Sequence, residues 1–171
     1  MDGHDEPVMR GSIDDRGPGP GEPETREHIR ALLDGQPFAV LCTQGEGQPY
    51  GSVVAYAAGT DLCSVAFATP RATRKYHLLC ECPSVALVID SRSSFPDDMI
   101  KVEAITATGR ATELEPGPEF DRWADLLSQR HPQLASFVHA PSSALFRIDI
   151  VRYLHVSRFQ EVRQWIPQRD G

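Results

Sequence analysis

The chain has 171 residues, 40% of them apolar, so it is long enough for one domain with a buried core and too short for two ordinary ones. Its 24 acidic and 17 basic residues give a net charge of −7, which leaves no surplus of cations to bind nucleic acid generally. No window approaches the roughly 20 consecutive apolar residues of a membrane-spanning helix, and the acidic N-terminus lacks the basic start of a secretion signal. We therefore expect a cytoplasmic protein that binds neither nucleic acid nor membranes.

The two ends of the chain differ in composition from the rest. Residues 1–21 are rich in glycine, proline and acidic side chains and have almost no periodic apolar pattern that would offset the entropy of ordering. We predict a flexible tail over residues 1–21, one domain over residues 22–167 and a short C-terminal tail over residues 168–171. The four cysteines lie in apolar segments without CxxC pairs and predict buried free thiols; Cys80-Glu81-Cys82 alone is weak evidence for metal or redox chemistry.

Apolar periodicity and turn residues predict the elements of the domain in chain order. They are a helix over 22–35, three antiparallel strands over 37–43, 50–57 and 62–69, a helix over 72–82, strands over 85–90 and 100–114, a helical stretch over 116–138, and a strand over 144–156. Gly109 lies inside a predicted strand and indicates a bulge or a close approach of two backbones. Since short turns join most strands, and closure removes exposed edges, we predict a mainly β fold, a six- to seven-stranded antiparallel barrel with peripheral helices.

The strongest indication of a functional site lies where the third predicted strand is followed by the second predicted helix. Three bases, Arg71, Arg74 and Lys75, fall within five residues there, beside the hydroxyls of Thr69 and Thr73. Hydroxyls and N–H groups at a helix N-terminus, together with nearby bases, are the groups that bind phosphate. The alternative is a basic surface, but cations in a first helical turn are unfavourable unless an anion or a carboxylate accompanies them. The segment therefore predicts a phosphate site without saying which phosphate.

The stretch F67-A-T-P-R-A-T-R-K-Y-H-L-L-C-E-C-P-S-V-A-L-V88 resembles the pyridoxamine 5'-phosphate oxidase-like family of split barrels that bind flavin mononucleotide (FMN). The resemblance implies that Arg74 and Lys75 bind the FMN phosphate, with Thr73 as a hydroxyl donor. It also implies that a group of strand residues lies against the flavin ring or ribityl chain: Ala68, Thr69, Ser52, Val53, Val54 and Ala55. Members of the family are homodimers that hold FMN between subunits, so we expect a homodimer with FMN at its interface.

The sequence also departs from the pyridoxamine oxidases themselves. It lacks their C-terminal Arg-x-His pair, and Glu103-Ala104 stands where they place a Gln facing the flavin, so vitamin B6 oxidation is not expected. The C-terminal arm carries Trp165, which either stacks on the flavin across a dimer or packs the arm onto the barrel. The predicted function is an FMN-dependent oxidoreductase of unassigned substrate, reduced by a nicotinamide cofactor or a partner protein. The alternative is a non-catalytic carrier or sensor of FMN, haem or another tetrapyrrole.

No catalytic residue can be assigned from the sequence. There is no GxSxG elbow, and the histidines show neither an i, i+4 pair nor an HExxH pattern, so no metal site is predicted. His28 is expected on the solvent side of the first helix.

Overall fold

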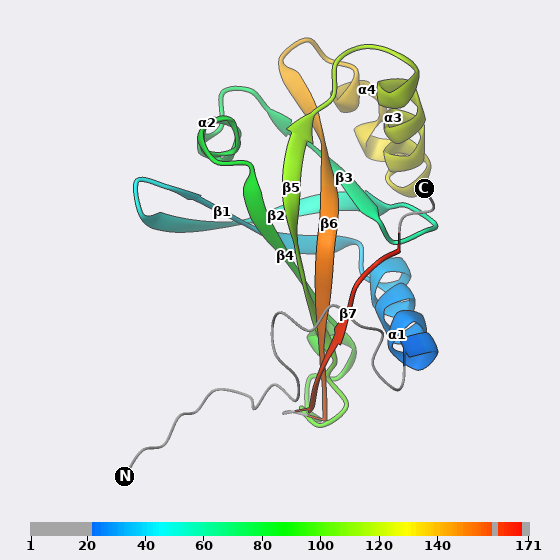
Figure 1. Ribbon diagram of the computed structural model, residues 1–171. Helices are drawn as coiled ribbons and strands as arrows, with labels where there is room; N and C mark the ends of the chain where they lie inside the picture. The colour runs from blue at the N-terminus through cyan, green and yellow to red at the C-terminus, as the bar shows by residue number, and fades with distance from the viewer. Residues whose placement is uncertain (1–21, 159–160, 169–171) are drawn as a thin grey trace.

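The computed structural model describes residues 22–158 and 161–168, and its strands form an antiparallel barrel with helices around it (Figure 1). The strands are β1 Phe38–Gly45, β2 Gln48–Ala58, β3 Ser64–Pro70, β4 Ser84–Asp90, β5 Ala104–Glu113, β6 Ser143–Ser157 and β7 Glu161–Trp165. The helices are α1 Glu22–Gly35, α2 Arg74–Glu81, α3 Pro118–Arg130 and α4 Ala135–Val138, with 3-10 turns at Arg92–Ser94 and Pro132–Leu134. The tail predicted over residues 1–21 lies outside the described residues.

One seven-stranded sheet runs in the order β3-β2-β1-β4-β5-β6-β7, and a further pairing of β3 with β6 closes six of its strands into a barrel. The seventh, β7, is added outside the closed ring by pairing with β6. The predicted mainly β barrel with peripheral helices is therefore confirmed. The predicted strand over 100–114 starts later, at Ala104, because turn hydrogen bonds such as Lys101 N to the carbonyl of Asp98 occupy the segment before it. Among the described residues, no helix is both long enough and apolar enough to cross a membrane.

The barrel interior is filled by one side chain in two along each strand, as the strand period requires. Phe67 and Phe146 face each other across the β3–β6 pair with ring centroids 5.6 Å apart. The largest fully buried side chains are Tyr56, Tyr153, Phe67, Ile29, Leu33, Leu41, Leu62, Leu87, Ile89, Ile105, Leu127 and Leu145. Burying each large apolar side chain contributes about 1.5–3 kcal/mol, so this core is the main source of stability.

Helix α1 lies against the barrel and its C-terminal carbonyls are capped from elsewhere in the chain (Figure 1). The hydroxyl of Tyr56 on β2 lies 3.0 and 2.8 Å from the carbonyl oxygens of Leu33 and Gln36 and shares its single proton between them. Arg130, at the end of α3, donates to the same two carbonyls at 2.6 and 2.7 Å, and its guanidinium lies 5.0 Å from the centre of the Tyr56 ring. The last carbonyls of a helix have no partner within the helix, so β2 and α3 together complete the end of α1.

Gly109 marks a bulge, as its position inside a strand predicts. The register between β5 and β6 shifts between Thr108 and Gly109. A Cβ built on Gly109 would come within 2.4 Å of the backbone oxygen of Asp149, so the two backbones approach too closely for any side chain. Glycine is required here by contact with β6, not by an unusual backbone angle.

We expect Gly109→Ala to lower the free energy of unfolding by about 1–3 kcal/mol, because the added methyl group forces β5 and β6 apart. Urea denaturation monitored by circular dichroism measures the change. Gly35→Ala is the matched control, since a Cβ at Gly35 meets nothing within 4 Å; we expect it to cause no loss of stability. Equal stability of Gly109→Ala and the wild type would contradict the close approach.

Candidate functional site

The junction between β3 and α2 is built around the hydroxyl of Thr73, which is the N-cap of α2. Its Oγ1 donates to the carbonyl of Pro70 at 2.8 Å and accepts from the backbone N–H of Tyr76 at 3.4 Å. The Oγ1 of buried Thr69 lies 3.0 Å from it, and because a hydroxyl has one proton, Thr69 is the donor of this pair. The Thr73 proton is therefore committed to Pro70, and donation to a phosphate, as the resemblance implies, requires that this bond be exchanged.

The three bases at this junction differ in their interaction partners. Arg71 pairs with Glu113 at 2.5 Å and donates to the Tyr76 hydroxyl at 3.0 Å, and the hydrogen bond to Glu113 raises the pKa of its guanidinium. Arg74 lies over the ring of Tyr50, 5.1 Å from its centre, and Lys75 is half-buried, which lowers the pKa of its ammonium. Among the residues that the structure describes, neither Arg74 nor Lys75 has a carboxylate within ion-pair distance.

These two cations begin a helix whose first turn contains no acidic residue. The N–H groups of Arg74 and Lys75 lack acceptors within the helix, as at any helix N-terminus, and the helix dipole adds positive potential at this point. The requirement that cations here be accompanied by a carboxylate or an anion is met for Arg71 by Glu113. For Arg74 and Lys75, no carboxylate among the described residues meets this requirement, and a bound anion would meet it.

The four predicted β2 residues divide between two faces. Ser52 and Val54 stand opposite buried Leu41 and Ala39 of β1 and point inward, whereas Val53 is 68% exposed. Ala55 stands opposite exposed Phe38 and points outward with Val53. Strand alternation therefore prevents all four side chains from contacting one ligand from the same side. Of the inward pair, Ser52 has a buried Oγ with no hydrogen-bond partner in the described chain.

The two predicted β3 residues also diverge. Ala68 packs beside the apolar cluster between the barrel and α3, whereas Thr69 is fully buried and points to Thr73. Trp165, on β7, is 6% exposed and belongs to the barrel core, with its ring 5.8 Å from that of Tyr153. Core packing accounts for the position of Trp165 within one chain, which leaves flavin stacking as a prediction.

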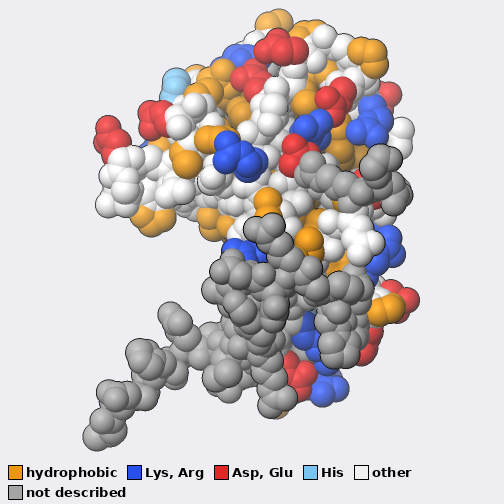
Figure 2. Space-filling view, viewed as in Figure 1, with side chains coloured by type: hydrophobic (Ala, Val, Ile, Leu, Met, Phe, Trp, Pro, Cys, Tyr) orange, Lys and Arg blue, Asp and Glu red, His pale blue; other side chains and the backbone are white. Residues whose placement is uncertain are grey.

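A row of five outward side chains, four of them apolar, crosses the outer face of the barrel and is named the apolar row. The strand registers align outward side chains from β2, β1, β4, β5 and β6: Val53, Val40, Val88, Thr106 and Leu154. A shallow groove runs beside this row, lined among others by Cys42, Ala86, Thr108 and Val151. Figure 2 shows hydrophobic side chains along the lower edge of the β1–β2 hairpin, which projects from the barrel on the left of Figure 1.

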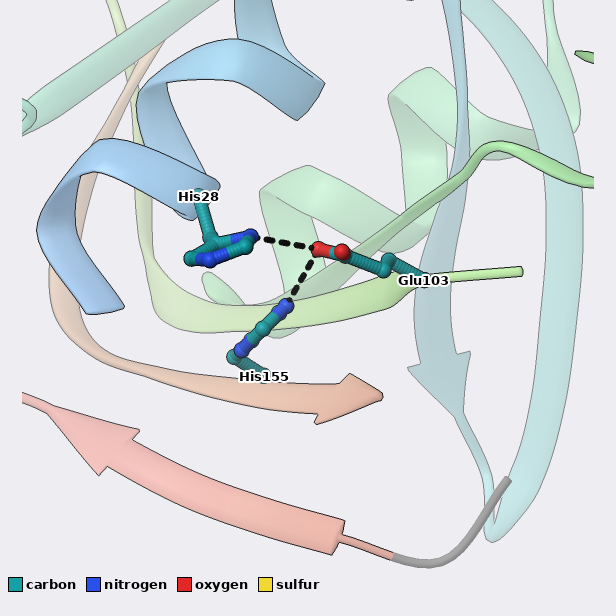
Figure 3. A group of neighbouring side chains, drawn as sticks. All are labelled: His28, Glu103 and His155. Carbon is teal, nitrogen blue, oxygen red and sulfur yellow. Dashed lines mark hydrogen bonds and ion pairs between the residues drawn. The ribbon is translucent and has the colours of Figure 1, made fainter. Parts of the chain in front are cut away.

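The structure also brings together three side chains that the sequence patterns did not connect (Figure 3). Glu103 Oε2 lies 3.0 Å from Nδ1 of His28 and 2.8 Å from Nε2 of His155, and the two imidazole rings are stacked 5.2 Å apart. His155 is 1% exposed, and burial lowers the pKa of its imidazole, although the hydrogen bond to Glu103 opposes this. The prediction that His28 lies on the solvent side of α1 is incomplete, because its ring turns to Glu103. The partners lie 75 and 52 residues from Glu103, so no local motif signals the cluster.

Comparison with known proteins identifies relatives of this fold. A family model described as pyridoxamine 5'-phosphate oxidase matches residues 25–157. A search of the curated proteins finds no match.

Solved structures similar to the chain include a haem-binding protein from Mycobacterium smegmatis, with a TM-score of 0.74, 16% identity, and coverage of 82% of this chain and 57% of that one. ChuZ from Campylobacter jejuni has a TM-score of 0.73 and 11% identity, with 84% and 60% of the two chains covered. An FAD-binding protein from Mesorhizobium loti has a TM-score of 0.63 and 18% identity, with 76% and 90% covered. The chain thus spans less than two thirds of the first two, and identities this low establish a shared fold alone.

Proposed function

Because the chain belongs to the pyridoxamine 5'-phosphate oxidase family, we propose that it binds FMN with the phosphate at the junction of β3 and α2, and that it acts as an FMN-dependent oxidoreductase. The observation that carries the proposal is the pair of cations, Arg74 and Lys75, that begin α2 without a carboxylate partner among the described residues. A phosphate monoester carries close to two negative charges at neutral pH and matches two cations and two open N–H groups.

The residues present fit the phosphate end of FMN by three criteria. Burial disfavours the charged form of the half-buried Lys75 ammonium, and a bound phosphate would stabilise that charged form. The guanidinium of Arg74 is held over Tyr50 and keeps its N–H fork for an anion. Arg71 stays with Glu113 and fixes the Tyr76 end of the helix. Arg74 and Lys75 bind the phosphate, while Arg71 orients the helix that carries them.

When bound, FMN supplies the redox chemistry, and the protein supplies its position, hydrogen bonds and access. The substrate is unassigned, and the electrons come from a nicotinamide cofactor or a partner protein. The second candidate is a non-catalytic carrier of FMN, haem or another tetrapyrrole. The haem-binding protein from Mycobacterium smegmatis, which shares the fold, is the reason to test haem directly.

The absorbance spectrum of the purified protein, with mass identification of the compound that heat releases, tests the ligand. A flavin spectrum and the mass of FMN are expected. A Soret band on addition of haem, with no flavin released by denaturation, would overturn the FMN assignment. Anaerobic mixing of the FMN-loaded protein with NADH and NADPH then tests the reaction: bleaching of the flavin is expected, and failure of both donors would favour the carrier.

We also propose a homodimer that holds FMN between its subunits. The support is the apolar row from Val53 to Leu154, in which a single chain leaves Val53 exposed and the other four side chains only half-buried. Such a row is typical of a protein interface, because apolar patches are otherwise kept small on soluble surfaces.

Val53→Asp is expected to weaken dimerisation at least about tenfold, because the interface would bury a carboxylate without a partner. Sedimentation velocity over a concentration series measures the shift from dimer to monomer. Ile100→Asp is the matched control: Ile100 is 65% exposed, close to the 68% of Val53, but lies in a turn outside the row. Equal dimerisation of Val53→Asp and Ile100→Asp would contradict an interface on this face.

A further inference from the structure

We propose that His28, Glu103 and His155 form a binding site for one divalent first-row transition-metal ion of the Zn²⁺ type. The three side chains converge from α1, from the residue just before β5, and from β6 (Figure 3). Their candidate donor atoms all lie within 4.8 Å of one another. Two imidazoles and one carboxylate form a ligand set that such ions favour.

The two distances from the Glu103 oxygen to the imidazole nitrogens are close to those of a coordination shell. Ligand atoms bound tetrahedrally to zinc at about 2.0–2.1 Å are separated from each other by about 3.3–3.4 Å. The Glu103 oxygen lies 3.0 Å from Nδ1 of His28 and 2.8 Å from Nε2 of His155. Retreat of the carboxylate by roughly half an ångström would bring both separations to that range. Glu103 has the freedom for this movement because its side chain is only partly buried.

Neighbouring residues position two of the three ligands, His28 and Glu103. The other ring nitrogen of His28 lies 3.8 Å from Oε1 of Glu24, whose Oε2 lies 3.8 Å from Arg163. A carboxylate beside the non-ligating nitrogen is the usual outer partner of a metal-bound histidine. The backbone of Glu103 is fixed by Ser91, whose N–H donates to the Glu103 carbonyl at 2.9 Å and whose hydroxyl accepts from the Glu103 N–H at 3.0 Å.

The proposed metal site is reachable from solvent and leaves a coordination position free. His155 is 1% exposed, whereas the side chains of His28 and Glu103 are 38% and 28% exposed, so an ion reaches the donors from the α1 side. Three protein ligands leave at least one coordination position for water or another small ligand, as in zinc sites that are not purely structural. The competing interpretation is a hydrogen-bonded tie between α1 and the barrel without a metal, and the two differ in their response to added ions.

Titration of the full-length protein, without an affinity tag and freed of metals by a chelator, with Co²⁺ tests the proposal. We expect saturable binding of one Co²⁺ per chain, with visible d–d bands typical of nitrogen and oxygen ligands, and displacement of Co²⁺ by Zn²⁺. His28→Gln and Glu103→Gln should each weaken binding at least about tenfold. Both replace partly exposed side chains, which avoids unfolding the buried His155 position. His139→Ala, which removes an exposed histidine outside the cluster, should bind as the wild type does.

Three results would overturn the proposal: no saturable binding, unchanged affinity in both cluster variants, or intense near-ultraviolet thiolate-to-cobalt bands. The last would assign the metal to cysteines, for which Cys80 and Cys82 are the nearest pair in sequence. None of these signals involves the flavin, so failure of the metal site is distinguishable from failure of the FMN proposal.

Discussion

Replacing both Arg74 and Lys75 by alanine is expected to weaken FMN binding by at least about 3 kcal/mol, a factor of about 150. In the proposed site each cation would make a charge-assisted hydrogen bond to the phosphate, worth about 1.5–3 kcal/mol, and Arg71 would not replace it because Arg71 is paired with Glu113. Quenching of flavin fluorescence during titration of the FMN-free protein measures the affinity.

Two controls separate a phosphate contact from general charge or misfolding. The variant Arg92→Ala/Lys101→Ala removes the same charge from exposed positions near β4 and β5, and should bind FMN as the wild type does. Riboflavin, which lacks the phosphate, should bind the Arg74→Ala/Lys75→Ala variant and the wild type equally. FMN affinity of that variant within about threefold of the wild-type value would rule out this junction as the phosphate site.

Phe67→Ala is expected to lower the free energy of unfolding by about 3–5 kcal/mol, which would remove much of the stability of a domain this size. Phe67 is completely buried, and its ring stacks nearly parallel on that of Phe146, with a 10° angle between planes. The ring of Phe146 in turn packs edge-on against the ring of Tyr76 on α2, with the ring centroids 6.0 Å apart. The cavity left by Phe67→Ala would therefore open beneath the helix that begins with Arg74.

The midpoint of urea denaturation measures this loss, provided that the slope of the transition is unchanged. Phe38→Ala is the matched control on β1: Phe38 is 54% exposed, and we expect a change below about 1 kcal/mol. Similar losses in the two variants would mean that burial in the barrel does not decide the effect, contrary to the packing described above.

The parts of the fold that local sequence determines were predictable. The strands predicted over 37–43 and 50–57 require a turn between them, and Glu46 and Gly47 do adopt positive φ angles of 52° and 76° there. The run of apolar residues at helical spacing predicted α1, and the glycine at 109 predicted the bulge. In each case the residues that decide the structure lie within one turn or one strand of each other.

What escaped prediction depends on partners far away in the chain. β7 is short and rich in polar residues, and it forms a strand because its backbone pairs with residues 153–157 of β6. The β2 site residues were predicted as one consecutive run, but strand alternation sends Val53 and Val54 to opposite faces of the sheet. Which of the two faces inward is known only from the pairing register of β2 with β1. The meeting of His28 with His155 depends on closure of the whole barrel and has no counterpart in sequence spacing.

The capping of α1 by Tyr56 and Arg130 has a consequence for the order of folding. An isolated helix of 14 residues is marginal in water, and this one has no basic residue in its last turn to stabilise its own carbonyls. Its end is completed by β2 and by α3, whose Arg130 lies 97 residues from Leu33 in the chain. We infer that α1 becomes stable together with the barrel and not before it. The side chains that α1 presents, His28 among them, are therefore brought to the barrel only when the barrel itself forms.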